Sequence, residues 1–361
     1  MGLKQLAKNL LKRIDDTYYY YVIRKAEYQK IEDRKNCWKQ VELTQQQIVE
    51  AEKVYGKGAD LRWHRYFQYF TGKFDPQYLP DPVFALDMEC KLNPRKIAVE
   101  MEDKARLPIF YSTVPDIVIP KTVVLNTSGI FYDGANNVVT REQAECLVKE
   151  FLEANGEAVM KPTRNTGGGA GVSILDTDSF AGLLCETDFI VQERIINQAD
   201  IQALNPSSLN TMRVITYICK EQYCYAPLAM RLGCGTNRLD NITSGGICVG
   251  VQDDGRLCPN AYTEYCIEKY TKHPYTGISF DGYAIQNVDK VIKAAIECHK
   301  RTPHMRMASW DFTLNHEGKA TLIEVNLIGQ SVCFPQYTHG KSLFGENTQE
   351  MLKVMKEKYY L

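Results

Sequence analysis

The stretch "SWDFTLNHEGKATLIEVNL", residues 309–327, has two runs of alternating apolar residues on either side of Glu317-Gly318. This pattern predicts a β-hairpin that turns at the central pair. Pairing across the turn places Asp311 opposite Glu324, and Asn326 points the same way as Glu324 because side chains alternate along a strand. The sequence therefore predicts two carboxylates and an amide oxygen on one face of a hairpin.

Facing carboxylates repel one another, so they must be protonated, paired with a base or bridged by a cation. Hard oxygen ligands that leave several positions open are what Mg²⁺ with nucleotide phosphates requires. The alternative is a solvated face of a surface hairpin, which the apolar residues of the second run disfavour because they make that strand look buried. We therefore expect Asp311, Glu324 and Asn326 to bind metal.

A second stretch, "GEAVMKPTRNTGGGAGVSIL" at residues 156–175, places Lys161 ahead of a run of glycines. Glycines in series mark a backbone that takes positive φ or approaches a ligand closely, and successive N–H groups in such a loop bind anions. The spacing fits neither the P-loop nor the dinucleotide-binding pattern. On these residues alone, a glycine-rich hairpin turn and a lid over phosphates are equally good interpretations.

The stretch "DFIVQERI", residues 188–195, predicts a strand that ends in polar residues, as a hinge between lobes does. Its backbone is suited to pair with an adenine edge, while Glu193 or Asp200 reaches an amino or hydroxyl group. The alternative for each acid, taken singly, is simple solvation.

The composition is that of a globular protein, with 361 residues, a formal net charge of -1 and 44% hydrophobic residues. This length predicts two or three lobes, and the near-zero charge argues against a general nucleic-acid binder. None of the 12 cysteines forms a Cys-x-x-Cys pair and no secretory leader is evident, so we expect reduced thiols in a cytoplasmic protein. No apolar run approaches the ~20 residues that span a bilayer.

Residues 1–14 have apolar residues at helical spacing, with basic residues between them. Such a helix either lies on anionic lipid at the inner face of the membrane or docks on its own domain, and the second interpretation is favoured. Residues 1–98 are predicted to be mostly helical, and short β-branched runs follow from residue 99, which predicts an α+β protein. The aromatic residues around His64 and Arg65 are interpreted as core.

The order of these parts resembles the ATP-grasp superfamily, with the quoted motifs "EDKARL", "TGGGAGV", "VQERI", "SWDF" and "IEVN" in sequence. The blocks "SSLNTMRVITYI", "MRLG", "LDNITSGGICVGV" and "HPYTGISFDG" are similar to the sugar-transfer-associated branch, which is found with bacterial surface-polysaccharide genes and is related to teichuronopeptide-type proteins. The resemblance runs from about residue 60 to residue 340. It implies two α+β lobes that clamp ATP, a central and lid lobe at 99–192 and a metal-binding lobe at 193–361, after the helical region 1–98.

The resemblance also implies which residues bind the nucleotide. Phosphates are held by Lys104 and Lys161 beneath a loop that includes Thr166, Gly167, Gly168 and Gly169. The adenine hinge comprises Gln192, Glu193 and Ile195, and Asp200 replaces a ribose-binding Glu that has no clear match here. One or two Mg²⁺, with Mn²⁺ as the alternative ion, are bound by Asp311, Glu324 and Asn326.

The implied catalytic residues are Lys161, Arg213 and Arg231, because planar guanidiniums suit oxyanions. A structural salt bridge is the rival interpretation for each arginine. Three further residues fall in the acceptor region by motif only, namely Asn210, Asn241 and His273.

The implied activity is that of an ATP- and Mg-dependent carboxylate–amine ligase working through an acyl phosphate, which joins an amino acid or peptide to a sugar for a surface polysaccharide such as a capsule. Positioning and charge neutralisation carry such phosphoryl transfer. The expected partners are ATP and small-molecule carboxylates and amines that are sugar-linked. The alternatives are a kinase for a sugar or lipid-linked sugar, and a silent ATP-binding scaffold, against which the intact metal and lysine set argues.

Overall fold

The structure, a computed structural model, describes residues 20–164, 171–178, 180–183, 188–235, 245–263 and 268–357. The chain divides into two compact units. The first unit comprises Met1–Arg95, Cys219–Gln222 and Ile328–Leu361, and the second comprises Lys96–Ile218 and Tyr223–Leu327. Within the described ranges, none of the helices is both long and apolar enough to cross a membrane. The predicted α+β protein with a helical N-terminal region is confirmed.

The first unit is built of helices. They are residues 20–33, α2 (Lys35–Trp38), α3 (Gln45–Tyr55), α4 (Arg62–Thr71), the π-helical segment η1 (Val83–Met88), α5 (Glu89–Leu92), α11 (Cys333–His339), η5 (Gly345–Asn347), α12 (Thr348–Leu352) and η6 (Lys353–Lys356). A capping box begins α3, where the Thr44 hydroxyl accepts from Gln47 N and the Gln47 side chain accepts from Thr44 N.

The aromatic residues of this unit form its core, as predicted. The ring of His64 is buried, packs edge-on against Tyr55 and lies 3.3 Å from the Pro76 carbonyl through Nε2. Burial lowers the pKa of His64 to about 4. The guanidinium of Arg65 lies 5.1 Å from the centre of the Trp38 ring. Both residues therefore serve packing.

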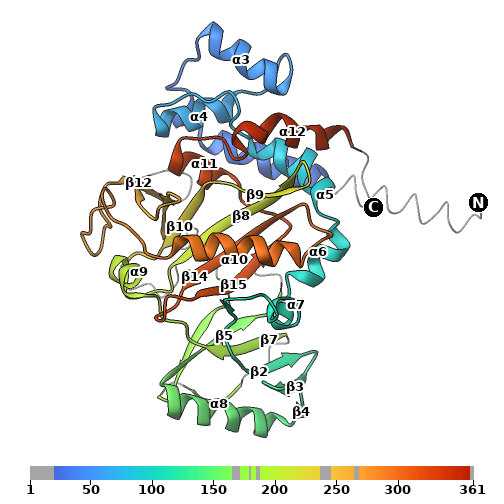
Figure 1. Ribbon diagram of the computed structural model, residues 1–361, viewed down its shortest axis with the longest axis vertical. Coiled ribbons are helices and arrows are strands. Elements are labelled where there is room, and N and C mark those ends of the chain that lie inside the picture. Colours follow the sequence, from blue (N-terminus) through green and yellow to red (C-terminus); the bar gives the residue numbers. More distant parts are fainter. Residues whose placement is uncertain are drawn as a thin grey trace, which may run out of the picture. The chain divides into compact units, whose positions relative to one another are not determined.

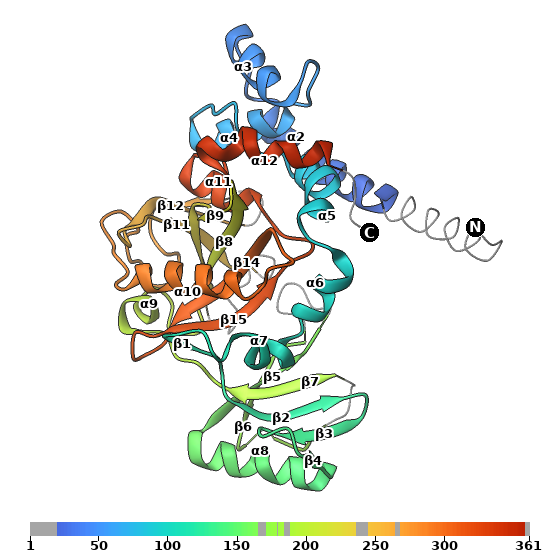
Figure 2. The same ribbon diagram turned by 45° about the vertical axis from the view of Figure 1, so that its right-hand side comes forward.

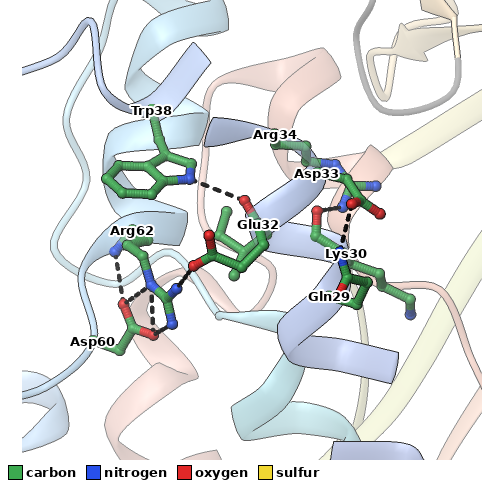
Figure 3. Close-up of polar contacts among 9 residues, drawn as sticks. Gln29, Lys30, Glu32, Asp33, Arg34, Trp38, Asp60 and Arg62 are labelled. Carbon is green, nitrogen blue, oxygen red and sulfur yellow. Dashed lines mark hydrogen bonds and ion pairs between the residues drawn. The ribbon is translucent and has the colours of Figure 1, made fainter. Parts of the chain in front are cut away.

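Polar contacts tie residues 20–33 to the start of α4 (Figure 3). The Arg62 guanidinium pairs with Asp60 and with Glu32. The indole Nε1 of Trp38 donates to the Ile31 carbonyl at 2.9 Å. The Arg62–Glu32 pair joins two segments of the first unit that are 30 residues apart in the chain.

The larger sheet of the second unit has nine strands among the described residues, in the order β1-β15-β14-β8-β10-β11-β12-β13, with β9 paired to β8. Their bounds are β1 (Ile117–Val118), β8 (Thr211–Cys219), β9 (Gln222–Tyr225), β10 (Leu228–Leu232), β11 (Ile247–Val251), β12 (Leu257–Thr263), β13 (Lys269–Tyr270), β14 (Met307–Leu314) and β15 (Ala320–Asn326). Helix α10 (Val288–Lys300) packs along β14 and β15 (Figure 1), and every residue of β14 is buried.

In the described ranges, the smaller sheet has six strands in the order β4-β3-β2-β7-β5-β6. Their bounds are β2 (Thr122–Thr127), β3 (Ile130–Asp133), β4 (Val138–Val139), β5 (Glu157–Pro162), β6 (Ser173–Asp176) and β7 (Phe189–Glu193). Helix α8 (Arg141–Asn155) lies across it (Figure 2) and buries Ala144, Val148 and Leu152, which share one helical face.

Helical segments lead from α5 to β1, namely α6 (Arg95–Met101), η2 (Lys104–Arg106) and α7 (Leu107–Tyr111). The chain passes from the larger to the smaller sheet between β1 and β2, and returns after β7. The chain from β7 to α9 (Ala199–Leu204) is anchored on the larger sheet, because Asn197 exchanges side-chain hydrogen bonds with the backbone of Asn210 at 2.9 Å. The backbone N–H of Gln198 also donates to the Leu314 carbonyl.

Candidate active site

The predicted hairpin is formed by β14 and β15, which are antiparallel with Asp311 opposite Glu324. The Nδ2 atom of Asn326 donates to Asp311 Oδ2 at 3.3 Å, so these side chains share a face. Beyond Asp311 the register shifts by one residue, because Ile323 is the extra residue of a bulge. The predicted pairing is confirmed at the three candidate metal ligands and is wrong from Phe312 towards the turn.

Asp311 lies at the centre of a buried ion-pair network. Its two oxygens accept from Nε and Nη2 of Arg213 at 2.5 and 3.1 Å, and Arg231 Nη2 lies 3.0 Å from Oδ2. Arg231 also donates to the hydroxyl of Thr211. The carboxylate is 1% exposed, and although burial alone would raise the pKa of Asp311, the two guanidiniums hold it below its usual value.

The strand order explains this network. On β8, Arg213 lies opposite Asp311 of β14 and opposite Ala229 of β10, and Arg231 lies opposite Thr211. Opposed residues and residues two apart share a face of a sheet. The sequence offered a salt bridge as an alternative for each arginine but could not show that both meet at one carboxylate.

The two candidate phosphate-binding lysines also come together. Lys104 Nζ lies 2.7 Å from Glu324 Oε1, and the backbone N–H of Lys104 donates to the Thr163 carbonyl, two residues beyond Lys161. Lys161 is buried on β5. Burial and the neighbouring Lys104 charge lower the pKa of Lys161 to about 8, against the opposing effect of Glu324. Two like charges are thus held near one carboxylate.

Of the other residues predicted to contact the nucleotide, the structure describes those of the hinge but not those of the glycine-rich loop. Thr166, Gly167, Gly168 and Gly169 lie outside the described residues, as do Asn241 and residues 1–14. At the predicted hinge, Gln192 Nε2 donates to the Pro120 carbonyl and Glu193 Oε1 accepts from Lys121 N. Ile195 follows half-buried. These side chains therefore fix the start of β2 against β7.

Asp200 is engaged in holding the backbone. Its Oδ1 accepts from Ile201 N and its Oδ2 from Gln286 N, both at 2.7 Å. Each oxygen thus has one acceptor position already used. The structure brings Asp200 to the start of α9, where its carboxylate ties that helix to the segment before α10.

The two described acceptor-region residues both support Gly233. Asn210 is fully buried, with Oδ1 accepting from Gly233 N and Ser208 Oγ. His273 Nε2 lies 3.0 Å from the Gly233 carbonyl, while its Nδ1 accepts from the N–H groups of Tyr275 and Thr276. This arrangement makes Nε2 the protonated nitrogen. Both side chains work as backbone supports in this structure.

The oxygen atoms of Asp311, Glu324 and Asn326 are of the kind that a divalent cation prefers. Asn326 turns its Nδ2 to Asp311, which leaves its Oδ1 as the ligand atom, and Glu324 is a quarter exposed with one oxygen on Lys104. Asp311 accepts four donor contacts, three on Oδ2 and one on Oδ1, so Oδ1 keeps one of the two acceptor positions of a carboxylate oxygen. Glu324, Asn326 and Asp311 Oδ1 therefore fit Mg²⁺ without the loss of a donor contact. No cluster of three His, Cys, Asp or Glu side chains suited to a metal occurs in the part of the chain that the structure describes.

Residues 102–104 were only partly anticipated from the sequence. Glu102 Oε1 accepts from Leu327 N, directly after Asn326, and Asp103 pairs with Arg164. Only Lys104 of these three had a motif that pointed to it. Acidic residues next to a candidate lysine are common, so the sequence carried no signal for the other two.

Comparison with known proteins identifies the family. A family model described as sugar-transfer associated ATP-grasp matches residues 84–351. VanG D-Ala:D-Ser ligase from Enterococcus faecalis is 17% identical over 71% of this chain and 60% of its own, with a TM-score of 0.38. N5-carboxyaminoimidazole ribonucleotide synthetase from Thermotoga maritima is 9% identical over 74% and 52%, with a TM-score of 0.42.

L-amino acid ligase from Bacillus licheniformis is 9% identical over 71% of this chain and 48% of its own, with a TM-score of 0.36. This chain thus spans between 48% and 60% of the lengths of the three enzymes. Similarity at this level identifies neither a substrate nor an activity. Comparison with curated proteins found no match.

The family match is of a different kind, because it covers about three quarters of the 361 residues. It also includes every candidate site residue from Lys104 to Asn326. The predicted ATP-grasp family and fold are thereby confirmed. The chain belongs to the sugar-transfer associated ATP-grasp family.

Proposed function

We propose that this protein is an ATP- and Mg²⁺-dependent carboxylate–amine ligase. A substrate carboxylate oxygen attacks the γ-phosphorus of ATP, and the bond to ADP breaks with its electron pair leaving on ADP. The amine nitrogen of a second substrate then attacks the acyl carbon of the acyl phosphate. The amide forms as the nitrogen loses a proton and inorganic phosphate departs.

The observation that carries the proposal is the placement of two lysines beside one carboxylate in the second unit. Lys104 and Lys161 repel each other, and burial disfavours the charge on Lys161. A polyphosphate offsets both costs, since its oxygens neutralise several cations at once. Such a lysine pair is therefore suited to hold the phosphates of ATP.

The arginines are suited to the phosphoryl group in transfer. Asp311 fixes Arg213 through two parallel bonds and holds Arg231 at 3.0 Å. Guanidiniums whose orientation is set in advance lose little freedom when they bind an oxyanion. Arg213, Arg231 and Lys161 are thus the proposed catalytic residues, with Asp311 orienting the two arginines.

A divalent cation is proposed at this face of the hairpin, where it would be held by Glu324, Asn326 and Asp311. When bound, Mg²⁺ neutralises charge on the phosphates and polarises the phosphorus. Lys104 pairs with Glu324 in this structure, and a cation on Glu324 would leave its ammonium group for the phosphates. One ion or two, and Mn²⁺ in its place, are compatible with this ligand set.

The remaining parts follow the family. Residues 99–192 form the proposed central and lid lobe and residues 193–361 the metal-binding lobe, with Thr166 and Gly167–Gly169 over the phosphates. The adenine hinge is proposed at Gln192–Ile195, with Asp200 near the ribose. The family description ties the chain to sugar transfer. We therefore propose an amino acid or short peptide joined to a sugar in surface-polysaccharide biosynthesis at the cytoplasmic side.

The test measures ADP release from MgATP with amino acids and short peptides, each crossed with uronic-acid and amino-sugar nucleotides. Glu324→Gln is the inactivating variant. Glu317→Gln is the matched control, because Glu317 lies in the turn of the same hairpin and forms an exposed ion pair with Lys319. The proposal predicts turnover that needs a carboxylate and an amine together, that is lost in Glu324→Gln and that is kept in Glu317→Gln.

Turnover with a hydroxyl sugar alone would instead identify a kinase that uses the same nucleotide site. ATP binding without turnover for any pair would favour a scaffold. Either result would contradict the ligase.

A further inference from the structure

Arg164 joins two carboxylates from different parts of the second unit. Its Nη2 donates to Asp188 Oδ2 at 2.7 Å, and its Nε lies 3.5 Å from Asp103 Oδ2. Asp188 immediately precedes β7, and Asp103 immediately precedes Lys104. The arginine thus connects the strand next to β5 with the turn that carries a candidate phosphate-binding lysine.

The two carboxylates are themselves fixed by backbone groups. Asp188 Oδ1 accepts from Ser128 N in the turn between β2 and β3, and Asp103 Oδ1 accepts from Ala105 N at the start of η2. Asp188 has a φ of 64°, a left-handed conformation that is uncommon for a residue with a side chain. An unfavourable backbone conformation is kept where the surrounding contacts require it. Arg164 therefore spans two rigid anchor points.

Arg164, Asp103 and Asp188 form an ion-pair triad. The triad flanks two backbone hydrogen bonds that set the distance between the segments of Lys104 and Lys161. Lys104 N donates to the Thr163 carbonyl, and Thr163 N donates to the Asp188 carbonyl, both at 3.0 Å. Asp103 lies one residue before the first of these bonds, and Arg164 one residue after Thr163. The triad thus closes a ring of hydrogen bonds around Thr163, which is 2% exposed.

We propose that Arg164 is a positioning residue that sets the spacing of Lys104 and Lys161 for the phosphates of ATP. The inference rests on the proposed nucleotide site. It assigns a role to Arg164, whose side chain bonds to Asp103 and Asp188 and acts on the lysines through the backbone. The lysines repel each other, so a fixed backbone connection is needed to keep both within reach of one ligand. Arg164, Asp103 and Asp188 supply that connection.

Because Arg164 is exposed, a positioning role and a purely structural role predict different effects of its loss. The Arg164 side chain is 37% exposed, and ion pairs of that kind contribute little to stability. Displacing a ligand-binding group by an ångström, in contrast, reduces its effect strongly. Loss of Arg164 is therefore expected to change nucleotide affinity while leaving the thermal midpoint almost unchanged.

The experiment measures the dissociation constants of MgATP, ADP and adenosine for the full chain and three variants, with the thermal midpoint of each. Arg164→Gln removes the guanidinium that bonds to both carboxylates. Arg164→Lys keeps the positive charge, but its ammonium group lacks the spread of donors that lets a guanidinium bond to both carboxylates. Arg106→Gln is the matched control, since Arg106 is two residues from Lys104 but pairs with Glu100 in an exposed ion pair. It removes an equal charge outside the triad.

We expect Arg164→Gln to raise the dissociation constants of MgATP and ADP about tenfold, Arg164→Lys to raise them by an intermediate factor, and Arg106→Gln to raise them less than about twofold. Adenosine, which has no phosphate, should bind all forms alike. Arg164→Gln and Asp188→Asn should be non-additive in a double-mutant cycle.

An unchanged nucleotide affinity in Arg164→Gln, with the wild-type chain binding MgATP, would overturn the positioning role alone. Equal losses in Arg164→Gln and Arg106→Gln would also overturn it, since they would indicate a general effect of charge. A wild-type chain that binds neither MgATP nor ADP would overturn the proposed function together with this inference.

Discussion

Lys104 Nζ lies 2.7 Å from Glu324 Oε1, so a residue of η2 forms an ion pair with a residue of β15 in the larger sheet. A phosphate that binds Lys104 must compete with this carboxylate. We therefore predict that Glu324→Gln binds metal-free ADP more tightly than the wild-type chain, by about threefold to tenfold, even though it loses turnover.

The measurement is calorimetric titration with ADP in the presence of EDTA. Lys104→Met should show the opposite change, a loss of about tenfold to a hundredfold, because a charge-assisted contact is removed. Weaker binding of metal-free ADP by Glu324→Gln would show that the carboxylate does not compete for Lys104.

The second prediction concerns the pH dependence of nucleotide binding. The pKa of Lys161 is lowered to about 8, first by burial and then by Lys104. The charged form is the one that binds phosphate, so affinity is fully present below pH 8 and is lost as the pH rises through that value. The dissociation constant of MgATP should rise by up to about tenfold per pH unit above pH 8. A constant affinity up to pH 9.5 would contradict this role of Lys161.

The third prediction concerns stability. Asp311→Asn removes the anion between Arg213 and Arg231, and leaves two poorly solvated guanidiniums facing an amide. We expect it to lower the free energy of unfolding by about 3 kcal/mol or more. Asp254→Asn, which breaks an exposed pair with Arg256, should change it by less than about 0.5 kcal/mol. Urea unfolding at pH 7 compares the two variants, and similar midpoints would mean that the buried network contributes little.

The hairpin shows how much of this site the sequence could predict. Strand alternation and one turn were enough to place Asp311, Glu324 and Asn326 together, because these features depend on neighbouring residues. The bulge at Ile323 could not be predicted, since nothing in the local pattern marks which residue is left unpaired. It lies on the turn side of the site, so the face of the three side chains was still correct.

The partners of these residues were beyond the sequence for a different reason. The pairing of Lys104 with Glu324, and of both arginines with Asp311, depends on the strand order β15-β14-β8-β10 and on how η2 meets it. That order is set by the packing of the whole unit. The roles of Asn210 and His273 as supports of Gly233 were hidden likewise, because a motif does not reveal which polar atoms bind backbone groups.

The fourth prediction concerns the first unit. Burial, with a further contribution from the Glu27 charge, raises the pKa of Asp81 to about 6 against the opposing charges of Lys30 and Arg34. The folded chain therefore holds a proton that the unfolded chain releases between about pH 4 and pH 6. The Asp81 contribution to stability falls as the pH rises through this window, by up to about 3 kcal/mol, and is constant above it.

Asp81→Asn should abolish this contribution, so that the variant gains stability relative to the wild-type chain between pH 4.5 and pH 7. The exposed Asp33→Asn is the control. Thermal midpoints of the three proteins at both pH values make the comparison, and a wild-type–variant difference that does not change with pH would contradict the assignment.

The ligase is tested most directly by the fate of a substrate oxygen. With the carboxylate and amine found to support ADP release, the carboxylate is labelled with ¹⁸O and the released phosphate is analysed by mass spectrometry. Attack of the carboxylate on the γ-phosphorus predicts one ¹⁸O atom in each phosphate formed with product. Unlabelled phosphate, or a phosphoryl group retained on the product, would contradict the acyl phosphate and with it the proposed function.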